Sequence, residues 1–166
     1  PDKKELSKDK AIVATRPPKR VVIPLLQHIG APCKLAVSIG QEVKKGDLIG
    51  MPEGFVSAPV HSSVSGKVIS IGDFPLPTGR IVNSVVIENN QKEEWTTLNE
   101  NPDYMNLSAD VLREKIRNAG IVGMGGAAFP THVKLSPPKE KPIDIVIING
   151  AECEPYLTAD YRLMLE

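Results

Sequence analysis

Proline and glycine divide this chain into short segments, and this punctuation limits its possible folds more than any other feature. The 166 residues include 15 prolines and 13 glycines. Proline fixes φ and lacks a backbone donor, and both residues are unfavourable inside long helices. The chain is therefore expected to form many short strands and turns rather than a bundle of long helices.

Residues 20–90 have the composition of a small all-β sandwich. Apolar runs at 21–23, 34–39, 42–49, 56–60, 66–71 and 81–87 are bounded by glycine, proline and aspartate. The pattern Gly-Gln-x-Val-x-x-Gly-Asp-x-Ile over 40–49, with Ala-Pro-Val at 58–60 and Ser-Gly-x-Val at 65–68, resembles the biotinyl/lipoyl type. That type carries its cofactor on a hairpin lysine, and residues 46–66 contain none. A carrier role is disfavoured, and a structural or docking module is the alternative.

The second half has the order helix, loop, strand, loop, helix. Ser108 is a suitable N-cap for a helix over 109–119, and Gly120 stands where a C-cap glycine belongs. Residues 143–148 are predicted to form a buried strand, and a last helix to begin at Thr158 or Ala159. The fold class is therefore α+β: an extended arm at 1–19, the sandwich at 20–90, a linker at 91–106 and the start of an α/β domain at 107–166.

The loop over residues 120–134 reads Gly-Ile-Val-Gly-Met-Gly-Gly-Ala-Ala-Phe-Pro-Thr-His-Val-Lys. A loop needs that many glycines only where the backbone takes positive φ or lies against a flat or charged group. It is not a Walker loop, because no Gly-Lys-Ser/Thr follows, and a helix rather than a strand precedes it, unlike a Rossmann fingerprint. Taken alone, it fits either a corner-turning loop or one wall of a nucleotide or flavin pocket.

Composition disfavours several functions. Twenty basic and twenty acidic residues cancel, so no overall field favours nucleic acid or an anionic membrane. Cys33 and Cys153 form no C-x-x-C pair, which argues against a zinc or iron–sulfur site in this chain. His28 and His61 are expected to be hydrogen-bonded structural residues rather than metal ligands or bases. No apolar run could cross a bilayer, and the chain, which ends inside an apparent helix, is expected to be part of a longer protein.

Two motifs resemble a known family. The pattern Gly-x-Gly-Gly-Ala-x-Phe-Pro-Thr-x-x-Lys over 123–134 and the pattern Asn-x-x-Glu-x-Glu-Pro over 149–155 look like the flavin-binding subunit of respiratory NADH dehydrogenases. They resemble more closely the RnfC family, the C subunits of Rnf electron transport complexes. Gln-His-Ile-Gly at 27–30 and Ala-Pro-Val-His at 58–61 extend the resemblance over nearly the whole chain from Val21 onward.

This resemblance implies an FMN site in an α/β FMN-binding domain. The implied cofactor-binding residues are Gly123, Gly125, Gly126, Phe129, Lys134, Asn149, Glu152 and Glu154. The glycines would let the backbone approach the flavin, and Lys134 would place a positive charge near its ring or phosphate. Asn149 would hydrogen-bond the isoalloxazine edge, Phe129 would stack on nicotinamide, and Glu154 would accept from the nicotinamide ribose or amide. The resemblance implies no catalytic side chain and no metal ligand here.

The implied function is electron transfer in a membrane-associated ferredoxin:NAD oxidoreductase, between NAD(H), FMN and iron–sulfur clusters, coupled to ion translocation. The implied partners are the other proteins of the Rnf complex, NAD(H) and ferredoxin, without nucleic acid or direct membrane insertion. Two 4Fe-4S clusters would lie in a C-terminal part, and the location would be the cytoplasmic face of a bacterial cell membrane, held peripherally.

This chain departs from the respiratory flavin-binding protein at two positions, which carry arginine and aspartate there and are Met124 and Ala151 here. Both changes remove polar contacts, and this piece alone is expected to be inactive and not to bind FMN tightly. An alternative is a non-catalytic assembly or docking role on the same fold, like that of the A subunit in the sodium-pumping NADH:quinone reductase.

Overall fold

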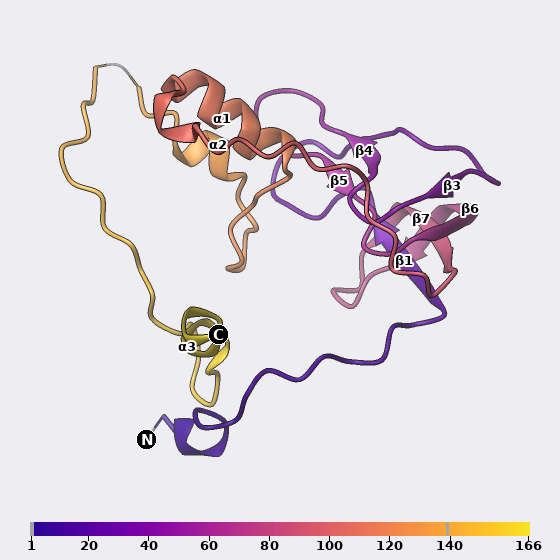
Figure 1. Ribbon diagram of the computed structural model, residues 1–166, viewed down its shortest axis with the longest axis horizontal. Helices are drawn as coiled ribbons and strands as arrows, with labels where there is room; N and C mark the ends of the chain where they lie inside the picture. Colours follow the sequence, from indigo (N-terminus) through magenta and orange to yellow (C-terminus); the bar gives the residue numbers. More distant parts are fainter. Residues whose placement is uncertain (1, 139) are drawn as a thin grey trace. The chain divides into compact units, whose positions relative to one another are not determined.

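The computed structural model describes residues 2–138 and 140–166, so Pro1 of the expected arm and Lys139 lie outside the described residues. By their contacts the residues form two compact units, drawn in Figure 1. The larger unit is Pro17–Pro138, and the smaller one combines Pro1–Arg16 with Lys139–Glu166.

Two antiparallel sheets form the β part of the larger unit (Figure 1). The first has the strand order β1-β7-β6-β3, and the second has the order β2-β4-β5. The strands are β1 (Arg20–Pro24), β2 (Lys34–Leu35), β3 (Glu42–Val43), β4 (Leu48–Met51), β5 (Val60–His61), β6 (Gly66–Pro75) and β7 (Ile81–Asn89). All the described strands thus lie between residues 20 and 89, which confirms the predicted all-β unit.

Apolar side chains from both sheets meet in one core, because the inward positions of the strands carry β-branched residues. Ile49, Val68, Val85 and Ile87 are completely buried. Each such side chain stabilises the fold by roughly 1.5–3 kcal/mol relative to leaving it in water. The remaining members of the core are Ile23, Leu25, Cys33, Val37, Val43, Val60 and Val64.

The hairpin of β6 and β7 is the longest element, and its tip lies at residues 76–80. Leu76 N–H donates to the Arg80 carbonyl at 2.7 Å, and Gly79 N–H donates to the Leu76 carbonyl at 2.9 Å. Gly79 takes a φ of 81°, a conformation that glycine adopts without strain. This turn places Thr78 and Arg80 on the same tip.

The helices are short. They are α1 (Ala109–Asn118), α2 (Thr131–Lys134) and α3 (Ala159–Leu165), with 3-10 turns η1 (Lys4–Leu6) and η2 (Tyr104–Asn106). The predicted helix after Ser108 and the predicted helix start near Ala159 are confirmed. Helix α2 and the 3-10 turns η1 and η2 were not anticipated from the sequence; η1 falls inside the expected arm and η2 inside the expected linker.

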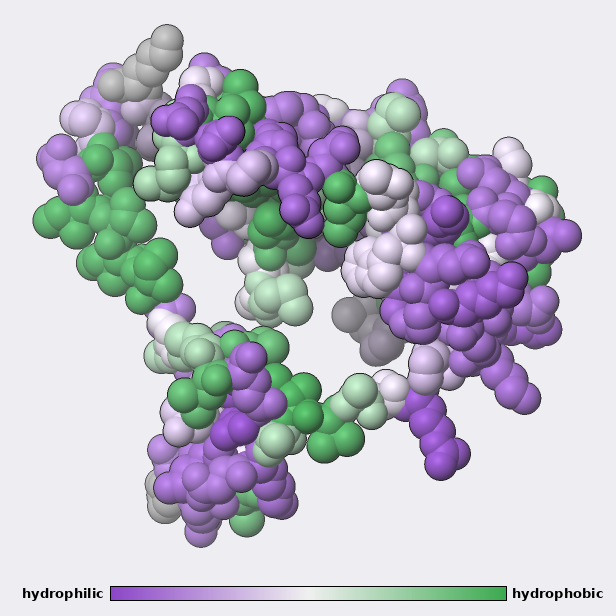
Figure 2. Space-filling view, in the orientation of Figure 1, coloured by the Kyte–Doolittle hydropathy of each residue, from purple (hydrophilic) through white to green (hydrophobic). Residues whose placement is uncertain are grey.

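The prediction of a buried strand over residues 143–148 is wrong for this chain. The segment pairs with no strand, and its aliphatic side chains are exposed, Ile147 at 86% and Ile148 at 85%. It forms the run of green on the left of Figure 2. A strand needs a neighbour to satisfy its backbone groups, and the described part of the smaller unit contains no other strand. Residues 143–148 are apolar, as a buried strand requires, but the described residues of the smaller unit form no sheet in which they could be buried.

Candidate functional site

Helix α1 ends directly before the glycine loop, and both of its ends are capped. Its N-terminus is capped by Ser108, whose Oγ accepts from Val111 N–H at 3.4 Å. At the other end, Gly120 takes a φ of 70°. Gly120 N–H donates to the Arg117 carbonyl at 2.9 Å, and Ile121 N–H donates to the Ile116 carbonyl at 3.3 Å. This pair of bonds is the Schellman motif, and it confirms the predicted role of Gly120.

The glycine loop is closed at its base and open at its tip. Gly123 N–H donates to the Phe129 carbonyl at 2.8 Å, and Thr131 N–H donates to the Ile121 carbonyl at 3.0 Å. Residues 124–127 beyond this closure are exposed, and Met124 reaches 96% exposure. The N–H groups of residues 124–127 donate to no atom of the described chain. The tip therefore offers consecutive backbone donors to solvent or to a ligand.

The three glycines inside the loop are not explained by backbone conformation. Among the loop glycines only Gly120 has a φ in the left-handed region. A Cβ built on Gly125 or Gly126 would meet nothing within 4 Å. Positive φ is thus excluded as the reason for glycine at positions 123, 125 and 126, and the open space at 125 and 126 permits close approach of a ligand.

Lys134 lies directly over the backbone of the loop. A Cβ built on Gly123 would stand 2.5 Å from the Lys134 Nζ. Helix α2 carries this lysine back to the base of the loop, where Phe129 is half-buried. Gly123, Phe129 and Lys134 are therefore brought together. Open space above glycine, free backbone donors and one ammonium fit a flat anionic cofactor such as FMN.

Three hydrogen bonds attach the loop and its helices to the β part of the same unit. Ile29 N–H donates to the Ala127 carbonyl at 3.0 Å. The Arg117 Nη2 donates to the Gly54 carbonyl at 2.9 Å, and His132 Nε2 donates to the Phe55 carbonyl at 2.8 Å. Residues 54 and 55 lie in the segment between β4 and β5, and this segment holds α1 and α2 through its backbone carbonyls.

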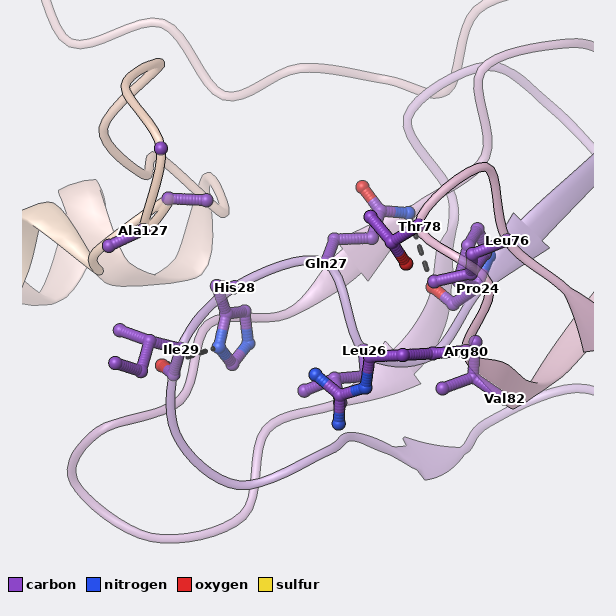
Figure 3. A pocket seen from close by; sticks show the side chains of 12 residues that line it. Pro24, Leu26, Gln27, His28, Ile29, Leu76, Thr78, Arg80, Val82 and Ala127 are labelled. Atoms are coloured by element: carbon purple, nitrogen blue, oxygen red, sulfur yellow. Dashed lines mark hydrogen bonds between the residues drawn. The ribbon is translucent and has the colours of Figure 1, made fainter.

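A cavity of about 460 Å³ lies between the loop tip and the β part. Its walls come from three segments: the end of β1 with the residues up to 29, the β6–β7 turn with the start of β7, and residues 126–128 of the loop (Figure 3). Its polar side chains include Gln27, Thr78 and Arg80. Sequence reasoning did not place these residues in a site, because Thr78 and Arg80 lie 40 or more positions before the loop and belong to no recognisable motif, and Gln27 was noted only as part of the 27–30 motif.

Two of the histidines, His28 and His132, have hydrogen-bond partners, whereas the ring of His61 has none among the described residues. His28 Nε2 lies 3.0 Å from the Ala58 backbone nitrogen and 3.1 Å from the Ala58 carbonyl oxygen, and Nδ1 lies 3.0 Å from the Ile29 carbonyl oxygen. His28 thus joins the 27–30 and 58–61 segments. Burial lowers the pKa of His61 below its usual value. The His132 Nδ1 has no partner among the described residues. No cluster of three metal-ligating side chains occurs in the described part of the chain.

The cysteines differ in environment. Cys33 is buried, its Sγ donates to the Ala58 carbonyl at 3.1 Å, and burial raises the pKa of its thiol. A raised pKa leaves less reactive thiolate at neutral pH. Cys153 is exposed in the polar loop. Cys33 is therefore a packing residue of the core.

The second predicted motif belongs to the smaller unit. Asn149 Oδ1 accepts from Ala151 N–H at 2.9 Å, a local turn. Glu152 Oε1 accepts from Tyr161 N–H at 3.0 Å near the start of α3. The Glu154 carbonyl accepts from Lys4 Nζ at 3.3 Å. The three polar residues are thus clustered locally, in a different unit from the glycine loop.

The N-terminal residues contact this polar loop. Lys4 Nζ also donates to the Leu157 carbonyl at 2.9 Å, and Ser7 Oγ donates to the Tyr156 carbonyl at 3.1 Å. Thr158 Oγ1 donates to Ser7 Oγ at 2.9 Å. Part of the segment expected to be an extended arm is therefore bound to residues 156–158. Lys4 holds it there through hydrogen bonds to backbone carbonyls.

Two family models match the chain. The RnfC barrel sandwich hybrid domain matches residues 1–92, and the Nuo51 FMN-binding domain matches residues 116–166. These matches confirm the predicted order, a sandwich-type β unit followed by the start of an FMN-binding domain. No helix in the described part of the chain is long and apolar enough to cross a membrane.

Curated relatives cover nearly the whole chain. It is 51% identical over 166 residues to the C subunit of the proton-translocating ferredoxin:NAD(+) oxidoreductase complex of Clostridium ljungdahlii, covering 99% of this chain and 36% of the relative. It is 47% identical over 165 residues to the Na(+)-translocating counterpart of Acetobacterium woodii, covering 99% and 37%. The C subunit of the ion-translocating oxidoreductase complex of Pseudomonas aeruginosa is 46% identical over 150 residues, covering 89% and 19%. The chain thus spans between about a fifth and little more than a third of the length of these relatives.

Proposed function

Since this chain belongs to the RnfC barrel sandwich hybrid family, we propose that it is the N-terminal part of an electron-transfer subunit in a membrane-associated ferredoxin:NAD oxidoreductase. The whole subunit would pass electrons between NAD(H), FMN and iron–sulfur clusters, coupled to ion translocation. The names of its relatives, which describe ferredoxin:NAD(+) oxidoreductases that translocate protons or Na(+), support this proposal.

The observation that carries the proposal is the open backbone at Gly125 and Gly126. A flavin ring lying there would meet main chain rather than side chains, and the N–H groups of residues 124–127 could donate to its polar edge or phosphate. Lys134, fixed over Gly123, would add positive charge that favours an anionic ligand. Flavin, when bound, supplies two-electron exchange with nicotinamide and one-electron exchange with iron–sulfur centres.

Other parts of the site stay proposals. Phe129 would stack on nicotinamide, and Asn149, Glu152 and Glu154 would complete the cofactor contacts. The domain boundaries at 20, 91 and 107 also stay proposals, beside family matches that cover residues 1–92 and 116–166. The full-length protein would lie peripherally at the cytoplasmic face of the membrane, held by the other members of the complex.

The proposal is tested by the flavin content of the full-length protein and of its Gly125→Val variant. Valine at this position has open space and an unstrained φ in the free chain, so the fold should be unaffected. The side chain would occupy the place of the ring, and FMN affinity should fall at least about a hundredfold, because the ring can no longer reach the backbone.

Gly72→Val is the matched control. Gly72 lies in β6, has no positive φ, and likewise has nothing within 4 Å of a built Cβ. This variant should retain its flavin. Equal FMN binding by the Gly125 and Gly72 variants would contradict the proposed loop site, and a full-length protein without flavin would favour the assembly or docking role.

A further inference from the structure

We infer that the tip of the β6–β7 hairpin forms the second wall of the flavin or nucleotide site, where Arg80 binds a phosphate group of the ligand. This inference rests on the proposed function and adds to it a contribution from the β unit. Neither family match assigns such a role to the hairpin, and the FMN-binding model begins only at residue 116.

The cavity supports this assignment by its position. Its volume of about 460 Å³ falls in the usual range for small-molecule sites. Gly126 and Ala127 line one side of it, and Thr78 and Arg80 line the other. In Figure 3 the side chain of Arg80 extends from the hairpin into this space. A ligand seated on the loop tip therefore faces the hairpin.

The charge of the cavity favours an anion. Arg80 makes no ion pair and no side-chain hydrogen bond within the described chain, whereas Arg20, Arg113 and Arg162 are each paired with a carboxylate. None of the residues that line this cavity is acidic. The cavities beside α1 differ, because Glu114 lines both of them next to Arg117. Arg80 thus leaves one uncompensated positive charge in the cavity.

The donors around the cavity match a phosphate group. The N–H groups of Gly126 and Ala127 have no acceptor among the described residues. The Thr78 hydroxyl lies on the opposite wall. The planar guanidinium of Arg80 can donate two parallel hydrogen bonds to one phosphate. Two sources carry this chemistry: the monophosphate of FMN and the diphosphate of a nicotinamide dinucleotide.

The test compares ligands with and without phosphate on the full-length protein. FMN, riboflavin and ADP are titrated against the wild type, Arg80→Gln and Arg20→Gln. Arg20 is the matched control, since it is an exposed arginine of the same β unit that pairs with Glu88 at 3.3 Å and does not line the cavity. If FMN supplies the phosphate, Arg80→Gln should weaken FMN binding about tenfold and leave riboflavin binding unchanged. If the dinucleotide supplies it, the loss should appear with ADP.

The guanidinium NMR signal of Arg80 gives a second readout. The Arg80 Nε–H of the wild type should shift on adding the phosphate ligand and not on adding riboflavin at equal saturation. If the Arg80 and Arg20 variants bind FMN and ADP as tightly as the wild type, the inference is wrong while the proposed function stands. If the wild type binds no flavin, both are wrong.

Discussion

Glycine serves two different purposes within a few residues of this loop. At Gly120 it is required by the fold, because φ is 70° and a Cβ would stand 2.7 Å from the Pro59 carbonyl oxygen. At Gly125 and Gly126 the fold requires nothing, since φ is ordinary and the space is open. The first position closes a helix against the β unit, and the other two keep a surface free of side chains. Substitutions should therefore affect stability at one place and binding at the other.

Gly120→Ala is predicted to destabilise the protein by more than about 2 kcal/mol, from left-handed strain and from the contact with Pro59. Urea unfolding of this variant and of a control measures the loss. Gly40→Ala is the control, since Gly40 has a φ of 90° with nothing within 4 Å of its Cβ position. It should cost only about 1–2 kcal/mol. Equal losses would mean that the contact with Pro59 is absent in solution.

The stability should depend on pH through His61. Burial lowers its pKa from the usual 6.5 in the folded protein, and unfolding restores the usual value. The unfolded state therefore binds more protons as the pH falls below that value, so stability is full above it and decreases on acidification. His61→Gln should flatten the fall in unfolding free energy between about pH 8 and pH 5. An unchanged slope would show that His61 titrates normally in the fold.

At the scale of elements, the segment over residues 51–59 binds the helices that flank the glycine loop, and its sequence did not predict this contact. The carbonyls of Gly54 and Phe55 accept from Arg117 and His132. The β part thereby holds α1 and α2, and with them both ends of the glycine loop. The loop is consequently fixed against the wall that carries Arg80.

His132→Leu should loosen the loop without unfolding the core. His132 is 4% exposed, and the change removes its hydrogen bond to Phe55, worth about 1–1.5 kcal/mol. Hydrogen exchange at the Gly123 amide, which donates to Phe129 across the loop base, should accelerate roughly tenfold. The Val68 amide of the buried sheet is the internal reference and should not change. Parallel acceleration at both amides would indicate global destabilisation instead.

The sequence predicted those elements whose start and end depend on neighbouring residues. The strands bounded by proline and glycine, the Ser108 cap and the Gly120 terminus all follow from neighbouring residues. The strand predicted over 143–148 failed because a strand depends on a partner, and composition alone cannot supply one. The short α2 was missed because four residues carry too little periodicity.

At the scale of the whole molecule, the site could be predicted only in part. The glycine loop was recognisable because four glycines in one loop indicate either positive φ or close approach of another group, and because its motif resembles a known family. Its attachment was not predictable, because Ile29, Gly54 and Phe55 contribute only backbone groups, which leave no signature in the sequence. The same holds for the cavity wall at Thr78 and Arg80, which tertiary packing alone brings near the loop.

The central claim is that the bare backbone at the loop tip lies against a flavin ring. Isotope-edited NMR of the full-length protein with FMN tests this most directly. Nuclear Overhauser contacts are predicted between the flavin ring protons and the amide protons of Gly125 and Gly126. Bound flavin that leaves these amide signals unshifted and without such contacts would contradict the account.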